Sequence, residues 1–416
     1  MFFFYKFLTY LIYPFIIILI YFRKIIKKED PNRFKEKILF QKNNASSDKL
    51  VWFHGASIGE LNSVIPIVKH FLKSNKNLKI LITTVTLSSG KIFEDEFKNE
   101  TNVVHKYFPV DIPHLVKDFI KKWNPSLAVF IDSEIWPNFI FEIKKKNIPI
   151  VLLNARITDK TLRRWSLFKN FAKKIFLSFN ICIASSINSK ENLERLGVNK
   201  VKYYGNLKYI NNPKRYKELE KVVTDSLKSR KIWLAASTHK NEEKFCLRTH
   251  QIIKNKYPNI LTIIAPRHIN RTREIMNEIK KSNLRGQVID DSKSIKENTD
   301  IALINSFGSL NKYYDHCKNI FMGKSLSKKL ALVGGQNPIE AARFGCKIYH
   351  GPYVYNFLEV YNFLKTNKIS EEINNEKELS SKIVFDIESN LKINDSKLKE
   401  IEIFGKNIFD STIQKL

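Results

Sequence analysis

Cysteine is scarce in this chain, and none of the usual cysteine patterns is present. The 416 residues include four cysteines, at Cys182, Cys246, Cys317 and Cys346. No two of them are close enough for a Cys-x-x-Cys pair, so the spacing argues against a zinc site. Widely spaced thiols are typical of proteins from a reducing compartment.

Several common catalytic signatures are also absent. The sequence has no Walker phosphate-binding loop, no dinucleotide-binding glycine pattern, no zinc-protease helix motif and no serine-hydrolase elbow. An Asp-x-Asp pair, a common way to hold a metal-bound nucleotide sugar, follows none of the apolar runs that we expect to be strands. We therefore predict a reaction that needs no metal and no other cofactor.

Acidic residues are outnumbered by basic ones. Lys and Arg total 71 against 41 Asp and Glu, which gives a formal net charge of +30. Such an excess can attract nucleic acid, anionic lipid or an acidic substrate. The lysines are spread along the chain, however, and no basic block alternates with aromatic residues at a recognisable spacing. This distribution argues against nucleic acid as a partner.

The N-terminus carries one long apolar run, which extends over 2–22 and is interrupted only by Lys6 and Thr9. About 20 such residues suffice to cross a bilayer as a helix. Four basic residues follow at once, at Arg23, Lys24, Lys27 and Lys28. Positive charge beside a span marks the cytoplasmic side. A cleaved signal peptide is the alternative, but the run ends in bulky residues that offer no cleavage site, so we predict a retained anchor.

After residue 48, short apolar runs alternate with helical patterns, which predicts βαβ units, parallel sheets and an α/β fold. We predict strands at 50–53, 80–83, 103–107, 127–131, 148–153, 181–184 and 201–204, and then at 232–236, 261–265, 301–304, 320–322 and 347–350. The polar segment 211–215 is the expected boundary between two sheets.

Five segments are predicted in all. They are a membrane anchor at 1–24, a juxtamembrane segment at 25–48, Rossmann-like domains at 49–212 and 213–375, and C-terminal helices at 376–416 that can cross back to the first domain. Two α/β domains that face each other form a cleft, and a cleft suits a substrate of two parts.

Glu60 is the leading candidate for chemistry. It ends a stretch of small residues after the apolar run 51–53, and Leu61, Val64 and Ile65 then begin a helical pattern. Glu60 should therefore lie in the first turn of a helix at the carboxyl end of a strand, where ligands bind. The positive end of the helix favours the ionised carboxylate, which can act as a general base. The alternative is that Glu60 only stabilises the start of its helix.

Two more groups follow predicted strands in the first half. Asp132 and Glu134 come directly after 127–131, and two carboxylates so placed can stabilise developing positive charge. They can equally cap the following helix. Lys208 follows 201–204 and can reach an anion, although exposed lysines are usually only solvated.

In the second half, Arg267 and His268 follow the predicted strand 261–265. The planar guanidinium of Arg267 suits a phosphate group. The alternative is an ordinary surface pair.

A glycine pair, Gly334 and Gly335, precedes Asn337, which is a favourable N-cap, and Glu340, which stands where a capping box places its carboxylate. Backbone N–H groups in such a loop can hold an anion. The alternative is a well-capped helix after a glycine loop.

The order of these motifs resembles one family closely, the 3-deoxy-D-manno-octulosonic acid (Kdo) transferases of lipopolysaccharide synthesis. The similar segments run over most of the chain, and besides the apolar N-terminus they are 54–60, 83–86, 134–138, 154–156, 205–208, 237–239, 266–268 and 334–340. One such segment would mean little, but this many in one order is specific.

The resemblance implies a two-domain GT-B glycosyltransferase anchored in the cell inner membrane, with its catalytic domains on the cytoplasmic face. It implies CMP-Kdo as the donor, bound by the second domain, a lipid A precursor as the acceptor, bound by the first, and contact with anionic lipids of the membrane. It further implies that Glu60 is the base and that Asp132 and Lys208 stabilise the transition state. The implied CMP-binding residues are Arg267, His268, Gly308, Ser309, Leu310, Gly334, Gly335, Gln336, Asn337 and Glu340.

The chain departs from the family pattern at a few positions. Asp132, Ser309 and Gln336 stand where Glu, Glu and His are expected. Two other functions remain open on the sequence alone: a GT-B transferase that uses another nucleotide sugar, and a membrane-tethered nucleic-acid-binding protein.

Overall fold

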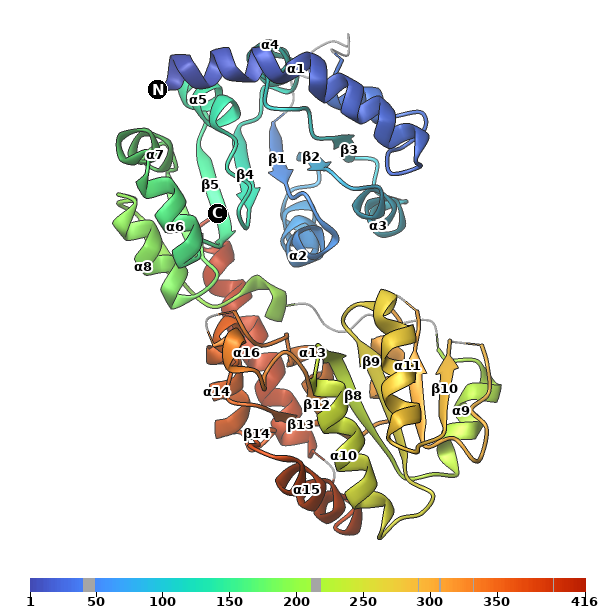
Figure 1. Ribbon diagram of the computed structural model, residues 1–416. Helices are drawn as coiled ribbons and strands as arrows, with labels where there is room; N and C mark the ends of the chain where they lie inside the picture. Colours follow the sequence, from blue (N-terminus) through green and yellow to red (C-terminus); the bar gives the residue numbers. More distant parts are fainter. Residues whose placement is uncertain (40–48, 211–217, 291, 307, 332, 392) are drawn as a thin grey trace. The chain divides into compact units, whose positions relative to one another are not determined.

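The chain divides into two compact units (Figure 1). Unit 1 comprises Met1–Asn211 and Phe404–Leu416, and unit 2 comprises Asn212–Ile403. The computed structural model describes residues 1–39, 49–210, 218–290, 292–306, 308–331, 333–391 and 393–416. The predicted boundary segment 211–215 lies outside these described residues.

Unit 1 is built on a seven-stranded sheet in the order β3-β2-β1-β4-β5-β6-β7. All neighbouring strands are parallel. The strands are β1 (Leu50–His54), β2 (Lys79–Thr84), β3 (Val103–Tyr107), β4 (Leu127–Ile131), β5 (Ile150–Ala155), β6 (Ile181–Ala184) and β7 (Val201–Tyr203). All seven strands predicted for this half are confirmed, to within two residues at most ends.

In the described part of the chain, two helices of unit 1 precede its first strand, and the others follow the strands in turn. They are α1 (Phe2–Ile25), η1 (Phe34–Lys37), α2 (Ile58–Ser74), α3 (Leu87–Phe97), α4 (Pro113–Trp123), α5 (Pro137–Lys145), α6 (Asp159–Ser166), α7 (Lys169–Phe176), α8 (Ile187–Arg195) and η2 (Leu207–Tyr209). The fully buried Trp52 of β1 organises the core beneath α4 and α5, with its ring centroid 5.1 Å from that of Phe119 and 5.6 Å from that of Phe139. Its indole N–H donates to Thr83 Oγ1, so the polar atom of this large ring is satisfied.

Unit 2 repeats the architecture with seven parallel strands in the order β10-β11-β9-β8-β12-β13-β14. The strands are β8 (Ile232–Thr238), β9 (Leu261–Pro266), β10 (Gly286–Ile289), β11 (Ile301–Ile304), β12 (Asn319–Met322), β13 (Lys347–His350) and β14 (Ser370–Glu372). The five predicted strands are confirmed. The sequence did not predict β10 and β14, which are the two edges of the sheet and contain few apolar residues.

The helices of unit 2 are α9 (Lys221–Lys228), α10 (Glu242–Lys254), η3 (Ile269–Arg271), α11 (Thr272–Lys281), α12 (Leu310–Tyr314), η4 (Lys328–Leu330), α13 (Ile339–Arg343), η5 (Tyr355–Phe357), α14 (Leu358–Thr366) and α15 (Glu376–Glu388). Trp233 of β8 and Phe321 of β12 are both fully buried in the core of this sheet. The two sheets thus form two α/β units of the Rossmann-like kind expected from the sequence.

The last helix, α16 (Asp395–Ile413), ends in residues that belong to unit 1. The ring of Phe404 lies 5.9 Å from that of Tyr209, and the ring of Phe409 lies 5.5 Å from that of His70. Ile408 packs directly on Gly205, where an added Cβ would lie 2.5 Å from Ile408 Cδ1. Gly205 also has a φ of +115°, so two independent constraints demand glycine here.

We expect Gly205→Ala to lower the free energy of unfolding of unit 1 by about 2–4 kcal/mol, because the new methyl group adds a steric clash to the backbone strain. Urea unfolding measures the change. Gly197→Ala is the matched control: its φ is +93°, but its nearest neighbour is the flexible side chain of Lys173, so about 1 kcal/mol should be lost. Equal losses in both variants would contradict the packing of α16 on Gly205.

Candidate active site

Four charged side chains gather at the carboxyl ends of the strands of unit 1. Glu60 lies in the first turn of α2, directly after β1. Asp132 and Glu134 follow β4, which is the neighbour of β1 in the sheet. Lys208 lies in η2 after β7, and its Nζ is 3.9 Å from Asp132 Oδ2. The three residues predicted to act in catalysis, Glu60, Asp132 and Lys208, therefore come from three different strand ends of one unit.

Glu60 takes part in a capping box with Ser57, the N-cap of α2. The backbone N–H of Glu60 donates to Ser57 Oγ at 3.4 Å, and that of Ser57 donates to Glu60 Oε2 at 3.1 Å. The N–H of Ala56 also donates to Oε2. The helix-start interpretation of Glu60 is thus confirmed. It does not exclude the chemical one, since these bonds use Oε2 of a side chain that is half-buried.

The surroundings of Glu60 favour a base. Burial raises the pKa of its carboxyl above the ordinary value, and the negative charges of Glu134 and Asp132 raise it further, against a lowering by the Ser57 hydrogen bonds. A carboxylate with a raised pKa accepts a proton more readily than an ordinary one. Perturbed carboxyls grouped in this way are typical of functional sites.

The two carboxylates after β4 have different partners. Glu134 Oε2 accepts from Trp136 Nε1 at 2.8 Å and lies 3.0 Å from His54 Nε2. Burial alone would raise the pKa of Glu134, but hydrogen bonding and the charge of His54, with help from Trp136, lower it overall. Asp132 accepts instead from Ser133 Oγ and faces Lys208. Both carboxylates thus have protein partners, and Asp132 is buried while Glu134 is half-buried. The catalytic role of Asp132 stays a prediction.

His54 is a participant that the sequence did not single out. It ends β1, is fully buried, and stacks on Phe108 with ring centroids 3.6 Å apart. Its Nδ1 lies 2.9 Å from Thr83 Oγ1 and its Nε2 contacts Glu134. The motif at 54–60 contained the histidine, but only the pairing of β1 with β4 brings it to Glu134.

The loops that follow β4 and β5 contain residues with an uncommon backbone conformation. Asp132 and Asn154 have φ values of +58° and +53°, a region that residues other than glycine seldom adopt. Asn154 lies at a bulge in β5, and its Oδ1 accepts from the backbone N–H of Leu207 at 3.0 Å. That bond ties the end of β5 to η2 and so places Lys208. Such strain is concentrated where function requires a defined geometry.

Unit 2 has a hollow of about 460 Å³ at the carboxyl ends of β8, β9 and β11. Its lining is Ser237, Ala265, Pro266, Arg267, Ile269, Ile304, Ser306, Gly308 and Leu310. Three predicted CMP-binding residues, Arg267, Gly308 and Leu310, are thus brought together, and the exposed Arg267 is available to an anion. Ser309 is buried beside them, with its Oγ 2.6 Å from that of Ser306. The ring of the exposed His268 lies 5.8 Å from that of His239.

The glycine pair has a packing role that the sequence did not reveal. A Cβ on Gly334 would lie 2.1 Å from the carbonyl oxygen of Tyr353, so the two chain segments can approach only if residue 334 is glycine. Gly335 has a φ of +89°. The backbone carbonyl of Gln336 accepts from the hydroxyl of Tyr361 at 3.1 Å. Contact of this loop with CMP stays a prediction.

The capping box predicted for Glu340 is wrong. Helix α13 begins at Ile339 with Pro338 as its N-cap, one residue later than expected, although Asn337 Oδ1 still accepts from the N–H of Ile339 at 3.1 Å. Glu340 forms a hydrogen bond with Asn311 instead. This bond joins α13 to α12, the helix that begins at the hollow.

One anion-binding loop of unit 2 is filled by the protein itself. The carboxylate of Glu242 accepts from the backbone N–H groups of His239, Lys324, Ser325 and Leu326, at distances from 2.7 to 3.1 Å. The loop after β12 is thereby fixed against the start of α10. Its N–H groups are used by Glu242.

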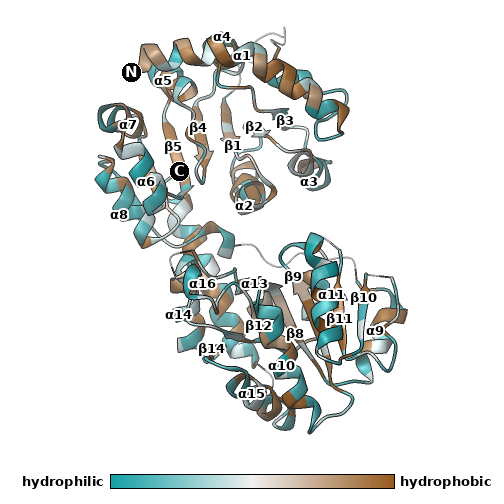
Figure 2. Cartoon of the chain, in the orientation of Figure 1, coloured by the Kyte–Doolittle hydropathy of each residue, from teal (hydrophilic) through white to brown (hydrophobic). Residues whose placement is uncertain are grey.

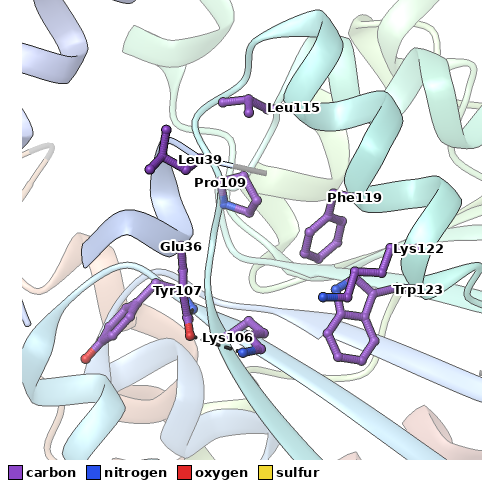
Figure 3. Close-up of a pocket in the computed structure, with 9 residues that line it drawn as sticks. All are labelled: Glu36, Leu39, Lys106, Tyr107, Pro109, Leu115, Phe119, Lys122 and Trp123. Atoms are coloured by element: carbon purple, nitrogen blue, oxygen red, sulfur yellow. Dashed lines mark hydrogen bonds and ion pairs between the residues drawn. The ribbon is translucent and has the colours of Figure 1, made fainter. Parts of the chain in front are cut away.

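A second hollow lies in unit 1, and its lining does not include Glu60, Asp132 or Glu134 (Figure 3). It is lined by Glu36, Leu39, Lys106, Tyr107, Pro109, Leu115, Phe119, Lys122 and Trp123. Glu36 already accepts from Lys106 Nζ at 3.1 Å and from the N–H of Tyr107 at 2.8 Å. None of the predicted site residues lines this hollow, and we give it no part in catalysis.

Metal binding has no candidate site in the part of the chain that the structure describes. Within those residues, no three side chains of His, Cys, Asp or Glu are grouped so that they could hold an ion. The carboxylates near Glu60 instead contact Lys208 and His54. The metal-free reaction stays a prediction.

Comparison with known proteins gives one family. The family model described as "3-Deoxy-D-manno-octulosonic-acid transferase (kdotransferase)" matches residues 32–211. A 3-deoxy-D-manno-octulosonic acid transferase from Rickettsia bellii is 28% identical over 388 residues, which are 93% of this chain and 91% of the relative. The same enzyme from Haemophilus influenzae is 30% identical over 318 residues, which are 76% of this chain and 73% of the relative. The chain belongs to the Kdo transferase family.

Solved structures agree on the fold of this Kdo transferase. A glycosyltransferase from Rickettsia africae superposes with a TM-score of 0.56 at 14% identity, over 88% of this chain and 94% of that one. A putative UDP-N-acetylglucosamine 2-epimerase from Listeria monocytogenes gives 0.57 at 13% identity, over 89% and 98%. These structures confirm the GT-B architecture expected from the sequence. The glycosyltransferase activity is confirmed by the membership of the Kdo transferase family.

Glu134→Gln tests the electrostatics around Glu60. The change removes a negative charge that helps to raise the pKa of Glu60, while the amide can still form hydrogen bonds with His54 and Trp136. Glu60 should then ionise at a lower pH. We therefore expect the acidic limb of the pH profile of kcat/KM to move to lower pH.

The control is Glu100→Gln, which removes an exposed carboxylate near the amino end of β3. Its acidic limb should coincide with that of the unsubstituted enzyme. If the acidic limb of Glu134→Gln moves to higher pH or does not move, Glu134 does not raise the pKa of Glu60.

Proposed function

We propose that this Kdo transferase moves Kdo from CMP-Kdo to a lipid A precursor in lipopolysaccharide synthesis, with inversion at the anomeric carbon and without a metal. The observation that carries the proposal is the grouping of Glu60, Asp132 and Lys208 at the strand ends of unit 1. A base, a carboxylate and a cation are the groups that a direct displacement on an activated sugar requires.

On the acceptor side, Glu60 takes the proton from the attacking hydroxyl. Its carboxylate is fixed through Oε2 by the N–H groups of Ala56 and Ser57, so Oε1 is held in one orientation. The raised pKa makes the proton transfer more favourable. Asp132 stabilises positive charge that develops on the sugar, and Lys208 fixes Asp132 in place.

On the donor side, the bond from the anomeric carbon to the phosphate oxygen breaks as the bond to the acceptor oxygen forms. The electron pair leaves with CMP, which departs as a phosphate monoester. Arg267 stabilises the negative charge of that phosphate, with Gly308 and Leu310 as walls of the same hollow. One base without a second nucleophile predicts a single displacement and hence inversion, by analogy with glycoside hydrolysis.

The acceptor is a membrane lipid, and α1 supplies the attachment. This helix of 24 residues is apolar and long enough to cross a bilayer. We propose that it holds the enzyme on the cytoplasmic face of the inner membrane. The net charge of +30 favours anionic lipids and an acidic acceptor there.

Glu60→Gln should lower kcat by about 10²–10⁴-fold, because the amide cannot accept the proton. The fold should persist, since a glutamine oxygen can also complete the capping box of α2. The assay incubates the purified protein with CMP-Kdo and a tetraacylated lipid A precursor and reads product masses, in which each added Kdo is one mass step. Near-normal turnover would remove Glu60 from the mechanism.

Affinity for CMP serves as the internal control of the Glu60→Gln variant. The candidate CMP site belongs to unit 2, so the Kd for CMP should stay within about twofold of that of the parent. The same titration with UDP and GDP tests the donor. A clear preference for UDP would show that the donor is a nucleotide sugar other than CMP-Kdo. It would not affect the role proposed for Glu60.

Arg267→Ala should raise the Kd for CMP by roughly 10–100-fold, the loss expected for one charged hydrogen bond to phosphate. Calorimetry with the full-length protein measures it. Arg273→Ala is the matched control, because it removes the same charge from an exposed position on the neighbouring helix α11. Similar affinities in the two variants would exclude Arg267 as a phosphate ligand.

A further inference from the structure

One face of α1 is bound to unit 1 along almost the whole helix. The residues that are half-buried or buried are Phe2, Tyr5, Lys6, Thr9, Tyr13, Ile16, Ile17, Ile20, Arg23 and Lys24. They recur every three or four positions, which is the spacing of a single helix face. Figure 1 shows α1 running across α4 and α5. The helix therefore lies along the unit over its full length.

Polar bonds hold this inner face in place. The hydroxyl of Tyr5 donates to Asp111 Oδ2 at 2.9 Å, and that of Tyr13 donates to the carbonyl of Ile38 at 2.6 Å. Asn138 Nδ2 donates to Thr9 Oγ1 at 3.4 Å. Asp111 is itself buried and accepts from two backbone N–H groups at the start of α5. These hydroxyl groups have their partners in the protein.

Aromatic and apolar contacts extend the attachment to both ends of the helix. The ring of Phe2 lies 4.0 Å from that of Phe141 on α5. Toward the other end, Ile20 is buried against Phe34 and Ile38. These contacts are about 27 Å apart along the helix, at 1.5 Å per residue.

The opposite face of α1 is apolar and exposed. Its large exposed side chains are Phe3, Phe4, Phe7, Leu8, Leu11, Ile12, Phe15, Ile18, Leu19, Phe22 and Ile25. Figure 2 shows the helix largely in the colour of apolar residues. An apolar stripe of this size on a soluble surface marks a contact with a membrane or a protein.

We infer that α1 lies in the plane of the membrane, with its inner face on unit 1 and its outer face in the acyl chains of one leaflet, rather than across the bilayer. The inference rests on the proposed membrane attachment and goes beyond it, because it specifies the orientation. A helix that spans the bilayer would have to leave α4 and α5 and expose the hydroxyl groups of Tyr5, Thr9 and Tyr13 to hydrocarbon, which is unfavourable.

Charge at the end of α1 identifies the surface as one with anionic headgroups. Arg23 binds Glu29, and Lys24 lies over the ring of Phe34. Lys27 and Lys28 follow and are exposed. Basic residues beside an apolar helix face are typical of helices that lie at the interface of anionic membranes.

Depth measurements on the full-length protein separate the two orientations. Phe4, Leu11 and Ile18 are seven residues apart on the outer face and are exposed by 62%, 59% and 66%. Each is changed singly to Cys and spin-labelled; the four native cysteines are buried. The labelled protein is bound to vesicles of phosphatidylethanolamine and phosphatidylglycerol. Each variant must keep transferase activity to be used.

For a helix in the plane, the three labels should report one common depth, about 5–10 Å below the headgroups. For a spanning helix, the label at position 11 should lie near the bilayer centre, with the other two about 10 Å to either side. Such a gradient would overturn the inference. A third outcome would also overturn the inference: labels that lipid does not reach and whose spectra are broadened by a second label nearby. A second copy of the chain would then cover the outer face of α1.

Two controls complete the design. Val222→Cys, an exposed apolar position on α9 of unit 2, should report water in every case. Vesicles without phosphatidylglycerol should bind the protein roughly tenfold more weakly or worse. An absence of binding to either vesicle would refute the membrane attachment itself, whereas the product-mass assay would still judge the transfer reaction separately.

Discussion

Parallel pairing of β1 with β4 is the constraint on which the candidate active site depends. Because both strands run in one direction, their carboxyl ends meet at the same edge of the sheet, so that residues 74 positions apart, Glu60 and Glu134, become electrostatic neighbours. The same geometry brings η2, after the last strand, within reach of Asp132. An antiparallel partner would have placed these groups at opposite edges. In unit 2 the parallel order β8, β9 and β11 likewise places Arg267 and Gly308 around one hollow.

Glu60 shows how one carboxylate can be both structural and chemical. Its Oε2 completes the capping box of α2, and this fixes the side chain without using both oxygens. A free glutamate would have to lose rotamer freedom before it reacted, whereas a capped one has already lost it on folding. The neighbouring charges of Asp132 and Glu134 then oppose the acidifying effect of the cap. The two interpretations that the sequence left open are therefore compatible.

Much of the fold could be predicted from the sequence because a buried parallel strand is a short apolar run between helices. Edge strands β10 and β14 were missed for the same reason, since an edge needs fewer apolar residues. The order of the motifs singled out Glu60, Asp132, Lys208 and Arg267 as candidate site residues. The pairing of His54 with Glu134 could not be predicted, because it joins residues 80 positions apart through the strand order. The occupation of the loop after β12 by Glu242 depends in the same way on tertiary contacts.

The N-terminal helix illustrates a limit of hydropathy. A helix that spans a bilayer is apolar on all sides, and so is a helix with one face on a protein and the other in lipid. Composition over 2–22 cannot separate the two cases, and only the inner hydroxyl groups distinguish them, because Tyr5 and Tyr13 donate to partners far away in sequence. Attachment along the full length of α1 would also fix the unit that carries Glu60 relative to the lipid surface. A flexible tether would leave that unit free to rotate, at an entropic cost whenever a lipid acceptor is bound.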